Sequence, residues 1–211
     1  MLNLVQIFFF IVALLVTLTV HEASHALAAY YLGDPTAKNR GRLTLNPIAH
    51  LDLLGTLVFI VTQRIGWGKP VPVNPANFKN PIRDNALTSL AGPMSNFILA
   101  FSVSLPLKYL SAYMHDYLSL ALWMIFDVSV FLGIFNLLPI PPLDGSKILG
   151  LILPRRLHLR YDHYLSEGGK YFVAIILIDV FILRSLVGFS FLAYILSFLH
   201  EWVSVILLLG S

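Results

Sequence analysis

The sequence contains no cysteine, and this absence excludes several kinds of chemistry at once. Without thiols there are no disulfides, no zinc sites built from cysteine ligands and no thiol nucleophile. Charge is also scarce, because Asp, Glu, Lys and Arg make up 12% of the 211 residues, whereas soluble domains carry about 25%. No basic run is long enough to indicate nucleic-acid binding. Together with a mean hydropathy of +0.79, this composition indicates an integral membrane protein.

Five apolar segments are long enough to cross a bilayer, which takes roughly 20 helical residues. They are residues 4–32, 86–107, 117–138, 170–185 and 187–209. The sequence therefore predicts an all-α polytopic membrane protein with about five transmembrane helices. The last two are expected to form a helical hairpin over about 170–209, with a tight turn at 184–186. A shorter apolar segment, 48–63, is either re-entrant or a short sixth span.

Two extended stretches flank this shorter segment, at residues 36–47 and 66–75, and both are rich in Thr, Val, Gly and Pro. Val71 and Val73 alternate with prolines, a pattern that suits an edge strand better than a central one. The pairing of the two stretches predicts a small membrane-associated β-sheet at one membrane face. An exposed strand edge is able to bind the backbone of an unwound peptide, so Val71 and Val73 are candidates for a substrate clamp.

The motif His-Glu-Ala-Ser-His at residues 21–25 lies inside the first apolar segment. His21 and His25 are four residues apart and project from one face of a helix, a spacing typical of two zinc ligands with Glu22 as general base. The alternative is that the two histidines are satisfied polar groups between packed helices. Three ionisable groups in five residues at bilayer depth are costly and seldom without function, which favours the metal site.

A catalytic zinc needs a third protein ligand and one open position. The best candidate is Asp144, which follows the proline-rich stretch FNLLPIPPLDGSK at residues 135–147. Prolines at 139, 141 and 142 cannot continue a helix, so the backbone must be extended there. Non-helical backbone at membrane depth is tolerated only where it lines a protein cavity.

Asp144 reaches the two histidines only if one span separates the first helix from segment 117–138, so 48–63 must not cross. The distribution of basic residues supports this arrangement. With 48–63 re-entrant, one face carries 12 of the 14 cations: Lys38, Arg40, Arg42, Arg64, Lys69, Lys79, Arg83, Lys147, Arg155, Arg156, Arg160 and Lys170. We expect a multi-pass protein of the cell (inner) membrane with its N-terminus outside, and its C-terminus and active site toward the cytoplasmic face.

Three ordered motifs, HEASH at 21–25, AGPMSN at 91–96 and NLLPIPPLDG at 136–145, resemble those of the site-2 protease family, intramembrane zinc metalloproteases of peptidase family M50. The resemblance is to the short bacterial branch without PDZ or CBS domains. It implies that His21, His25 and Asp144 bind one zinc ion per chain and that Glu22 activates water. It also implies that Asn136 or Asn96 binds the substrate backbone or the oxyanion. The alternative for Asn96 is a role in helix packing, with Gly92 as a close-approach residue.

The family resemblance further implies hydrolysis of peptide bonds within or near transmembrane segments of other proteins in the lipid bilayer. The whole chain, 1–211, is expected to form one membrane-embedded protease domain with a catalytic core over about 1–150. Two other function classes remain open: a membrane metal carrier and a non-catalytic scaffold that binds membrane helices. The oligomeric state, the substrate and the pathway are not given by the sequence.

Overall fold

The computed structural model describes residues 3–52, 55 and 68–210, and the regular elements within them are all helices. Within this part of the chain, three helices are long and apolar enough to cross a membrane, which confirms the first three predicted spans. They are α1 (Leu4–Tyr31), α4 (Pro81–Leu110), which continues into the 3₁₀ turn η3 (Ser111–Tyr113), and α5 (Asp116–Leu137). The protein is therefore an all-helical membrane protein.

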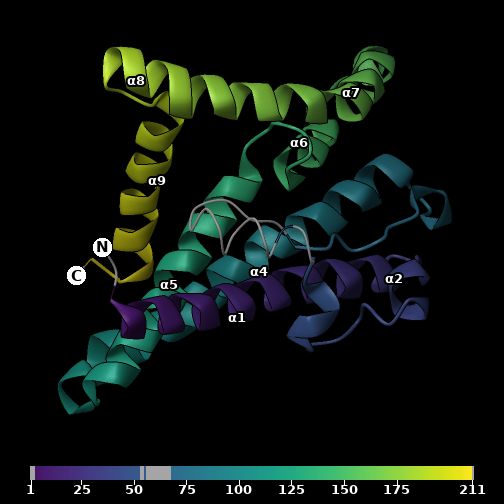
Figure 1. The fold of residues 1–211 in the computed structure, drawn as a ribbon. Helices are drawn as coiled ribbons and strands as arrows, with labels where there is room; N and C mark the ends of the chain where they lie inside the picture. Colours follow the sequence, from purple (N-terminus) through teal and green to yellow (C-terminus); the bar gives the residue numbers. More distant parts are fainter. Residues whose placement is uncertain (1–2, 53–54, 56–67, 211) are drawn as a thin grey trace.

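The helices α1, α4 and α5 pack against one another in one bundle (Figure 1). Ala13, Ala26 and Ala29 of α1 are fully buried. Small side chains let membrane helices approach closely, since lipid offers no hydrophobic drive for their association. Across the bundle, the hydroxyl oxygens of Thr17 and Ser129 lie 3.0 Å apart, which ties α1 to α5.

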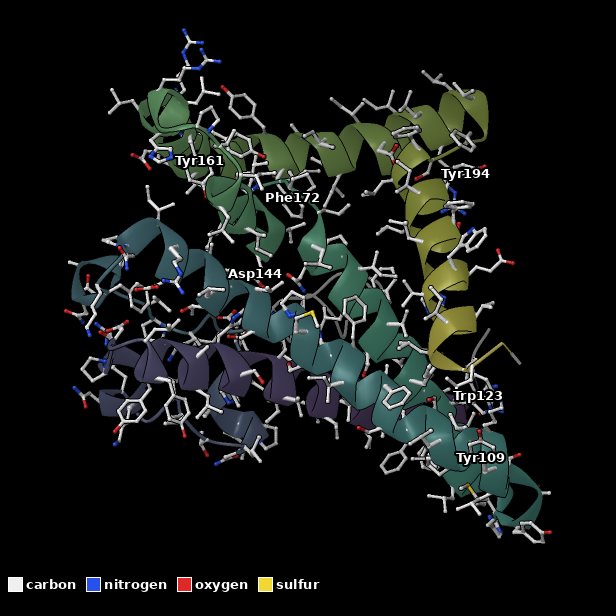
Figure 2. All side chains as sticks on the ribbon, turned by 180° about the vertical axis from the view of Figure 1, so that it is seen from behind. Tyr109, Trp123, Asp144, Tyr161, Phe172 and Tyr194 are labelled. Atoms are coloured by element: carbon white, nitrogen blue, oxygen red, sulfur yellow. The ribbon has the colours of Figure 1, made fainter. Side chains whose placement is uncertain are left out.

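The proline-rich stretch after α5 interrupts the helix as predicted. α5 ends at Leu137, residues 138–143 are non-helical, and the short helix α6 (Asp144–Ile148) begins at the predicted third ligand. A Cβ on Gly145 would lie 2.2 Å from the carbonyl oxygen of Leu137, so only glycine allows the chain to fold back this tightly. The hydroxyl of Tyr161, on α7 (His158–Leu177), contacts the carbonyl oxygen of Lys147 at 2.9 Å, so α7 packs over α6 (Figure 2).

The predicted C-terminal hairpin with a turn at 184–186 is wrong. α7 runs without a break through the π-helical η6 (Ile178–Leu183) and α8 (Arg184–Val187), and the turn comes at Gly188 in the left-handed conformation. α9 (Phe191–Leu207) then leads away at a steep angle to α7 and α8, rather than returning along them (Figure 1). Asp179 accepts hydrogen bonds from Ser190 and the Phe191 N–H, so a carboxylate fixes the start of α9.

The two ends of the described chain lie at the same end of the bundle (Figure 1). Lys108, near the end of α4, donates to the carbonyl oxygens of Leu208 and Leu209 at 3.1 and 3.0 Å. This arrangement differs from the expectation that the two termini lie on opposite membrane faces. Its cause is the C-terminal region, in which α9 alone returns along the bundle and the preceding helix lies across it.

The predicted β-sheet is not found among the described residues. Thr36–Asn39 forms a short helix, α2, and Pro47–His50 a 3₁₀ turn, η1. The pairing of the two stretches is limited to one isolated antiparallel bridge between Leu51 and Gly68. Residues 68–74 remain non-helical and are followed by a 3₁₀ turn, η2 (Pro75–Asn77). Most of segment 48–63, at 53–54 and 56–63, lies outside the described residues.

Side-chain hydrogen bonds, rather than a strand ladder, hold residues 68–77 against the end of α1. The buried carboxylate of Asp34 accepts from the Asn74 N–H at 2.7 Å and from the Asn77 amide at 2.6 Å. Burial alone raises the pKa of Asp34, but the hydrogen bonds from Thr36, Asn74 and Asn77 outweigh it and leave that pKa below its ordinary value. Asp34 therefore stays ionised near neutral pH and anchors the segment.

Candidate metal centre

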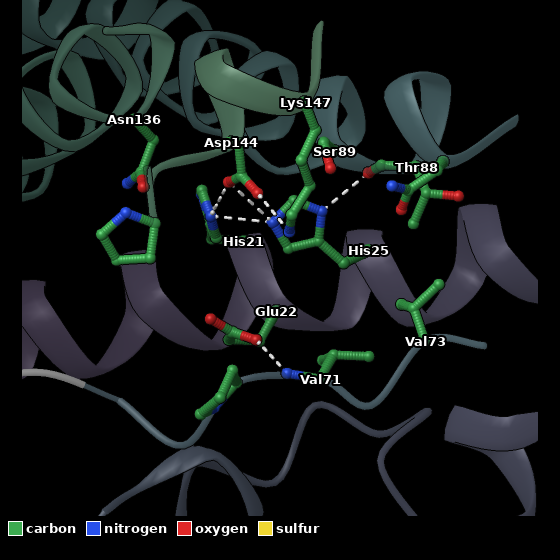
Figure 3. Close-up of a pocket in the computed structure, with 13 residues that line it drawn as sticks. His21, Glu22, His25, Val71, Val73, Thr88, Ser89, Asn136, Asp144 and Lys147 are labelled. Atoms are coloured by element: carbon green, nitrogen blue, oxygen red, sulfur yellow. Dashed lines mark hydrogen bonds and ion pairs between the residues drawn. The ribbon is translucent and has the colours of Figure 1, made fainter. Parts of the chain in front are cut away.

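His21 and His25 lie one helical turn apart on the buried face of α1, as their spacing predicted. Their Nε2 atoms are 3.0 Å apart. Asp144 arrives from α6, and its Oδ2 lies 3.2 Å from His21 Nε2 and 3.1 Å from His25 Nε2 (Figure 3). All three side chains are buried, and they form a cluster able to hold a metal ion.

The donor set fits a zinc ion. Zinc in a tetrahedral site binds nitrogen and oxygen at 2.0–2.2 Å, which places neighbouring donor atoms about 3.3 to 3.6 Å apart. The observed triangle, with sides of 3.0, 3.1 and 3.2 Å, is slightly smaller than one face of such a site, so a small outward movement of the side chains would admit the ion. The fourth corner would then be open on the cavity side.

The second ring nitrogen of His25 fixes its tautomer. His25 Nδ1 lies 2.7 Å from the carbonyl oxygen of Thr88 on α4, so Nδ1 carries the hydrogen and donates it. The lone pair is then on Nε2, which faces His21 and Asp144. Such an outer contact orients a histidine ligand toward its metal. No side-chain pattern identifies Thr88 in the sequence, because its backbone carbonyl makes the contact.

Asn96 lies behind His21, on the side away from Asp144. Its amide Nδ2 is 3.0 Å from His21 Nδ1, and its amide oxygen is buried without a hydrogen-bond partner among the described residues. A half-turn of the amide exchanges the two atoms, so that His21 Nδ1–H donates to the Asn96 oxygen. His21 then presents the Nε2 lone pair that a metal requires. The orphaned oxygen is therefore explained by a metal-binding His21.

Glu22 lies beside the triangle and takes no part in it. Its Oε2 accepts a hydrogen bond from the Val71 N–H at 3.0 Å (Figure 3). Together with the three clustered residues, Glu22 lines a cavity of about 150 Å³. A carboxylate at the edge of a metal site is able to take a proton from a water bound there.

The same cavity collects some of the remaining predicted site residues. Val71, Val73 and Asn136 line it, whereas Asn96 is not among its lining residues. Asn136 donates its amide to the carbonyl oxygen of Leu132 at 3.0 Å. Lys147, which the sequence analysis did not single out as a site residue, also lines the cavity, and its Nζ is 3.7 Å from Asp144 Oδ1.

Comparisons with known proteins identify the family of this chain. The family model for Peptidase family M50 matches residues 107–178. The chain is 40% identical over 176 residues to "Putative zinc metalloprotease YwhC" of Bacillus subtilis, covering 79% of each protein. The chain belongs to peptidase family M50, the site-2 protease family. It is also 32% identical over 183 residues to "Putative zinc metalloprotease Rip2" of Mycobacterium tuberculosis, covering 84% of this chain and 68% of that relative.

A shorter match is to "Putative zinc metalloprotease MJ0611" of Methanocaldococcus jannaschii. It is 38% identical over 69 residues, which are 31% of this chain and 34% of the relative. No solved structure matches the chain.

Gly92 brings α4 of this M50 protein against the two histidines. A Cβ at this position would lie 2.4 Å from His25 Nε2 and 2.7 Å from His21 Cε1, so the predicted close-approach role is confirmed. Gly92→Ala is expected to displace the rings and weaken zinc binding by about 10- to 100-fold, as other losses of ligand orientation do. Competition with a zinc chelator measures this affinity.

Gly169→Ala is the matched control, because a Cβ on Gly169 of α7 meets nothing within 4 Å. Equal zinc affinity in the two variants would show that close approach at Gly92 does not matter to the site.

Proposed function

We propose that this chain is an intramembrane zinc metalloprotease that hydrolyses peptide bonds within or near transmembrane segments of other membrane proteins. The observation that carries the proposal is the triangle of His21, His25 and Asp144, with Glu22 at its edge, inside helices apolar enough to cross a membrane. The family membership and the names of the relatives support zinc as the metal, at one ion per chain. The whole chain then acts as a single protease domain.

Glu22 is the proposed general base. Zinc held by His21, His25 and Asp144 would lower the pKa of a bound water and polarise the scissile carbonyl. Glu22 accepts the proton of that water at Oε1 or Oε2 and delivers it to the leaving amine, while the water oxygen bonds to the carbonyl carbon and the C–N bond breaks. The contact from Val71 N–H to Oε2 holds the carboxylate beside the cavity, so that it need not reorient before the reaction.

The two asparagines are given different roles. Asn136 lines the cavity, so we propose that it binds the substrate backbone or the oxyanion. Asn96 contacts His21 from behind, so we propose that it positions a zinc ligand and does not touch substrate.

Residues 70–73 are the proposed substrate clamp. A helix must unwind before its backbone is cleaved, and an extended segment beside the site is able to pair with the freed groups. Val71→Pro and Val73→Pro are both expected to lower cleavage of a membrane substrate by about tenfold or more. Each proline removes one backbone N–H, and loss of one hydrogen bond to a buried group has an effect of this size. Zinc content stays unchanged. The effect should be larger for Val71→Pro, which also removes the donor to Glu22.

Val71→Ala is the control for the clamp, since it keeps the backbone N–H and is expected to retain turnover. Wild-type turnover by Val73→Pro would rule out pairing along this segment, even if Val71→Pro were inactive.

The proposed orientation places the metal site toward the cytoplasm and the N-terminus outside. It rests on the sequence prediction that at least 12 of the 14 cations lie on the metal-site face when 48–63 does not cross. Because the two termini lie at one end of the bundle, we propose that the C-terminus is outside as well. Labelling of a cysteine introduced at Lys79 with a membrane-impermeant reagent should require permeabilised cells. Labelling in intact cells would mean that the orientation is the opposite of the proposed one.

Comparative proteomics tests the substrate class. Membrane fractions of cells with the wild-type chain are compared with fractions of cells with Glu22→Gln, and single-span proteins should accumulate in the variant. A metal carrier or a scaffold does not need Glu22 as a base. If the two proteomes are the same and the variant still binds zinc, proteolysis of membrane segments is excluded in favour of those classes.

A further inference from the structure

A second cavity lies on the other side of the extended segment from the metal site. Its volume is about 170 Å³, well above the 10–15 Å³ that one water requires. Among the described residues it is lined by Arg40, Arg42, Lys69, Pro70 and Pro72. Val71 and Val73 line the metal cavity, whereas Pro72 lines this one and Pro70 lines both. Successive side chains of an extended chain point to opposite sides, so this one segment lines the metal cavity with one side and the second cavity with the other.

Arg42 is the buried cation of this second cavity, because only 6% of its surface is exposed. Its Nη2 donates to the carbonyl oxygen of Lys69 and lies 3.5 Å from His50 Nδ1. His50 donates from Nε2 to the Thr44 carbonyl oxygen at 2.9 Å, so this histidine supports the loop. The Nε of Arg42 is buried and has no hydrogen-bond partner among the described residues. A buried guanidinium with an unused donor is costly unless a ligand completes it.

The cavity holds three cations and no carboxylate among its described lining residues. Arg40 and Lys69 are exposed, so they are accessible from outside. The residues that the structure does not describe between 53 and 67 include no Asp or Glu, so they cannot neutralise it either. The carboxylate of Glu22, in the metal cavity, attracts Arg42, but one carboxylate does not balance three cations. Like charges that converge in one pocket repel each other, and the simplest ligand that neutralises the rest is an anion.

We propose that this cavity binds a phosphate group, as carried by the headgroup of an anionic phospholipid. The planar fork of arginine pairs with phosphate through two parallel hydrogen bonds. The cavity is formed by residues that follow α1, where a membrane-spanning helix reaches the bilayer surface and lipid phosphates lie. Basic pockets at such positions are suited to lipid headgroups.

The bound phosphate would also act on the metal site. Pro70 lines both cavities, and the next residue, Val71, donates to Glu22. A phosphate on Lys69 and Arg42 fixes the start of this segment, and so holds Val71 against the carboxylate. This effect on cleavage rests on the proposed function, whereas the binding itself does not.

The experiment measures lipid binding by the purified full chain, without reference to activity. Short-chain phosphatidylglycerol and short-chain phosphatidylcholine are titrated separately in detergent, and the rise in Tm gives each affinity. The test variant is the double substitution Arg40→Gln/Lys69→Gln, which changes exposed residues and leaves the buried Arg42 in place. The control is Lys79→Gln/Arg83→Gln, which removes two exposed cations outside the cavity.

We expect the test variant to bind phosphatidylglycerol about tenfold or more weakly than wild type, since each cation near an anionic surface contributes about 1 kcal/mol. The control should stay within about twofold. If inorganic phosphate competes with the lipid, the cavity recognises the phosphate group alone. If inorganic phosphate does not compete, recognition also requires the rest of the lipid. Equal loss in the test and control variants would overturn the site. Unchanged lipid affinity with a raised KM for a substrate bearing acidic residues would overturn the lipid and assign the pocket to substrate.

Discussion

Replacement of Glu22 by glutamine should lower kcat/KM for peptide cleavage by about 100- to 10,000-fold, the range that a positioned general base contributes. Glutamine has the same shape and still accepts a hydrogen bond from the Val71 N–H, so the cavity keeps its form. It cannot take a proton from water at neutral pH. Because Glu22 is not a member of the metal cluster, zinc content should be unchanged.

The measurement is cleavage of a single-span substrate in detergent or liposomes, with zinc quantified in the same preparation. Glu167→Gln is the matched control, since Glu167 pairs with Lys170 on the surface of α7 and does not line the metal cavity. An active Glu22→Gln variant would remove the general base from the account. Loss of zinc in that variant would instead make Glu22 a ligand.

Asp144→Asn should reduce zinc affinity by more than about 100-fold, a larger effect than the 10- to 100-fold lost with an outer-contact residue. The substitution keeps the size of the side chain but replaces an anionic ligand by a neutral amide. It also brings that amide within 3.2 Å of two imidazoles whose lone pairs face it. Activity should fall with the zinc content and return only in part at high zinc concentration.

The variant Lys147→Ala is the control, because it removes a neighbour of Asp144 and leaves the ligand itself in place. Lys147 contacts the other oxygen of Asp144 at 3.7 Å and is not a candidate ligand. Zinc affinity should remain near the wild-type value in this variant. Stoichiometric zinc in Asp144→Asn after chelation would mean that the third ligand is another residue.

The core of the site was predictable because its determinants are local. The spacing of His21 and His25 defines one helix face, and the prolines before Asp144 define a break whatever the tertiary fold. Counting the spans between α1 and α5 then decides whether the carboxylate reaches the histidines. The distances of 3.1 and 3.2 Å in the structure agree with that count.

The surroundings of the site were less predictable, because they depend on contacts between distant segments. Asp34 reads as an ordinary turn residue after Gly33, yet its partners are 40 and 43 residues further along the chain. Thr88 acts through its carbonyl oxygen, which every residue possesses. The Val-Pro alternation at 70–73 correctly indicated non-helical backbone, but the predicted edge strand is not found. It could not show that side-chain hydrogen bonds would take the place of a sheet.

The prediction for the C-terminal region was wrong for a different reason. Hydropathy marks where apolar residues occur but not where a helix begins or ends, and the helix through α7 and α8 starts in the polar sequence at His158. Gly188 ends this helix because its left-handed conformation suits glycine. The charge of Arg184 interrupts the apolar run and led to the predicted turn at 184–186. In the structure Arg184 is instead an exposed residue of α8.

The central claim is that His21, His25 and Asp144 bind zinc together, and X-ray absorption at the zinc edge of the purified full chain tests it most directly. The account predicts about one zinc per chain with nitrogen and oxygen ligands at about 2.0–2.2 Å and scattering from two imidazole rings. One of those rings should disappear in His25→Ala. A chain that binds no zinc, or a spectrum that His25→Ala leaves unchanged, would contradict the account.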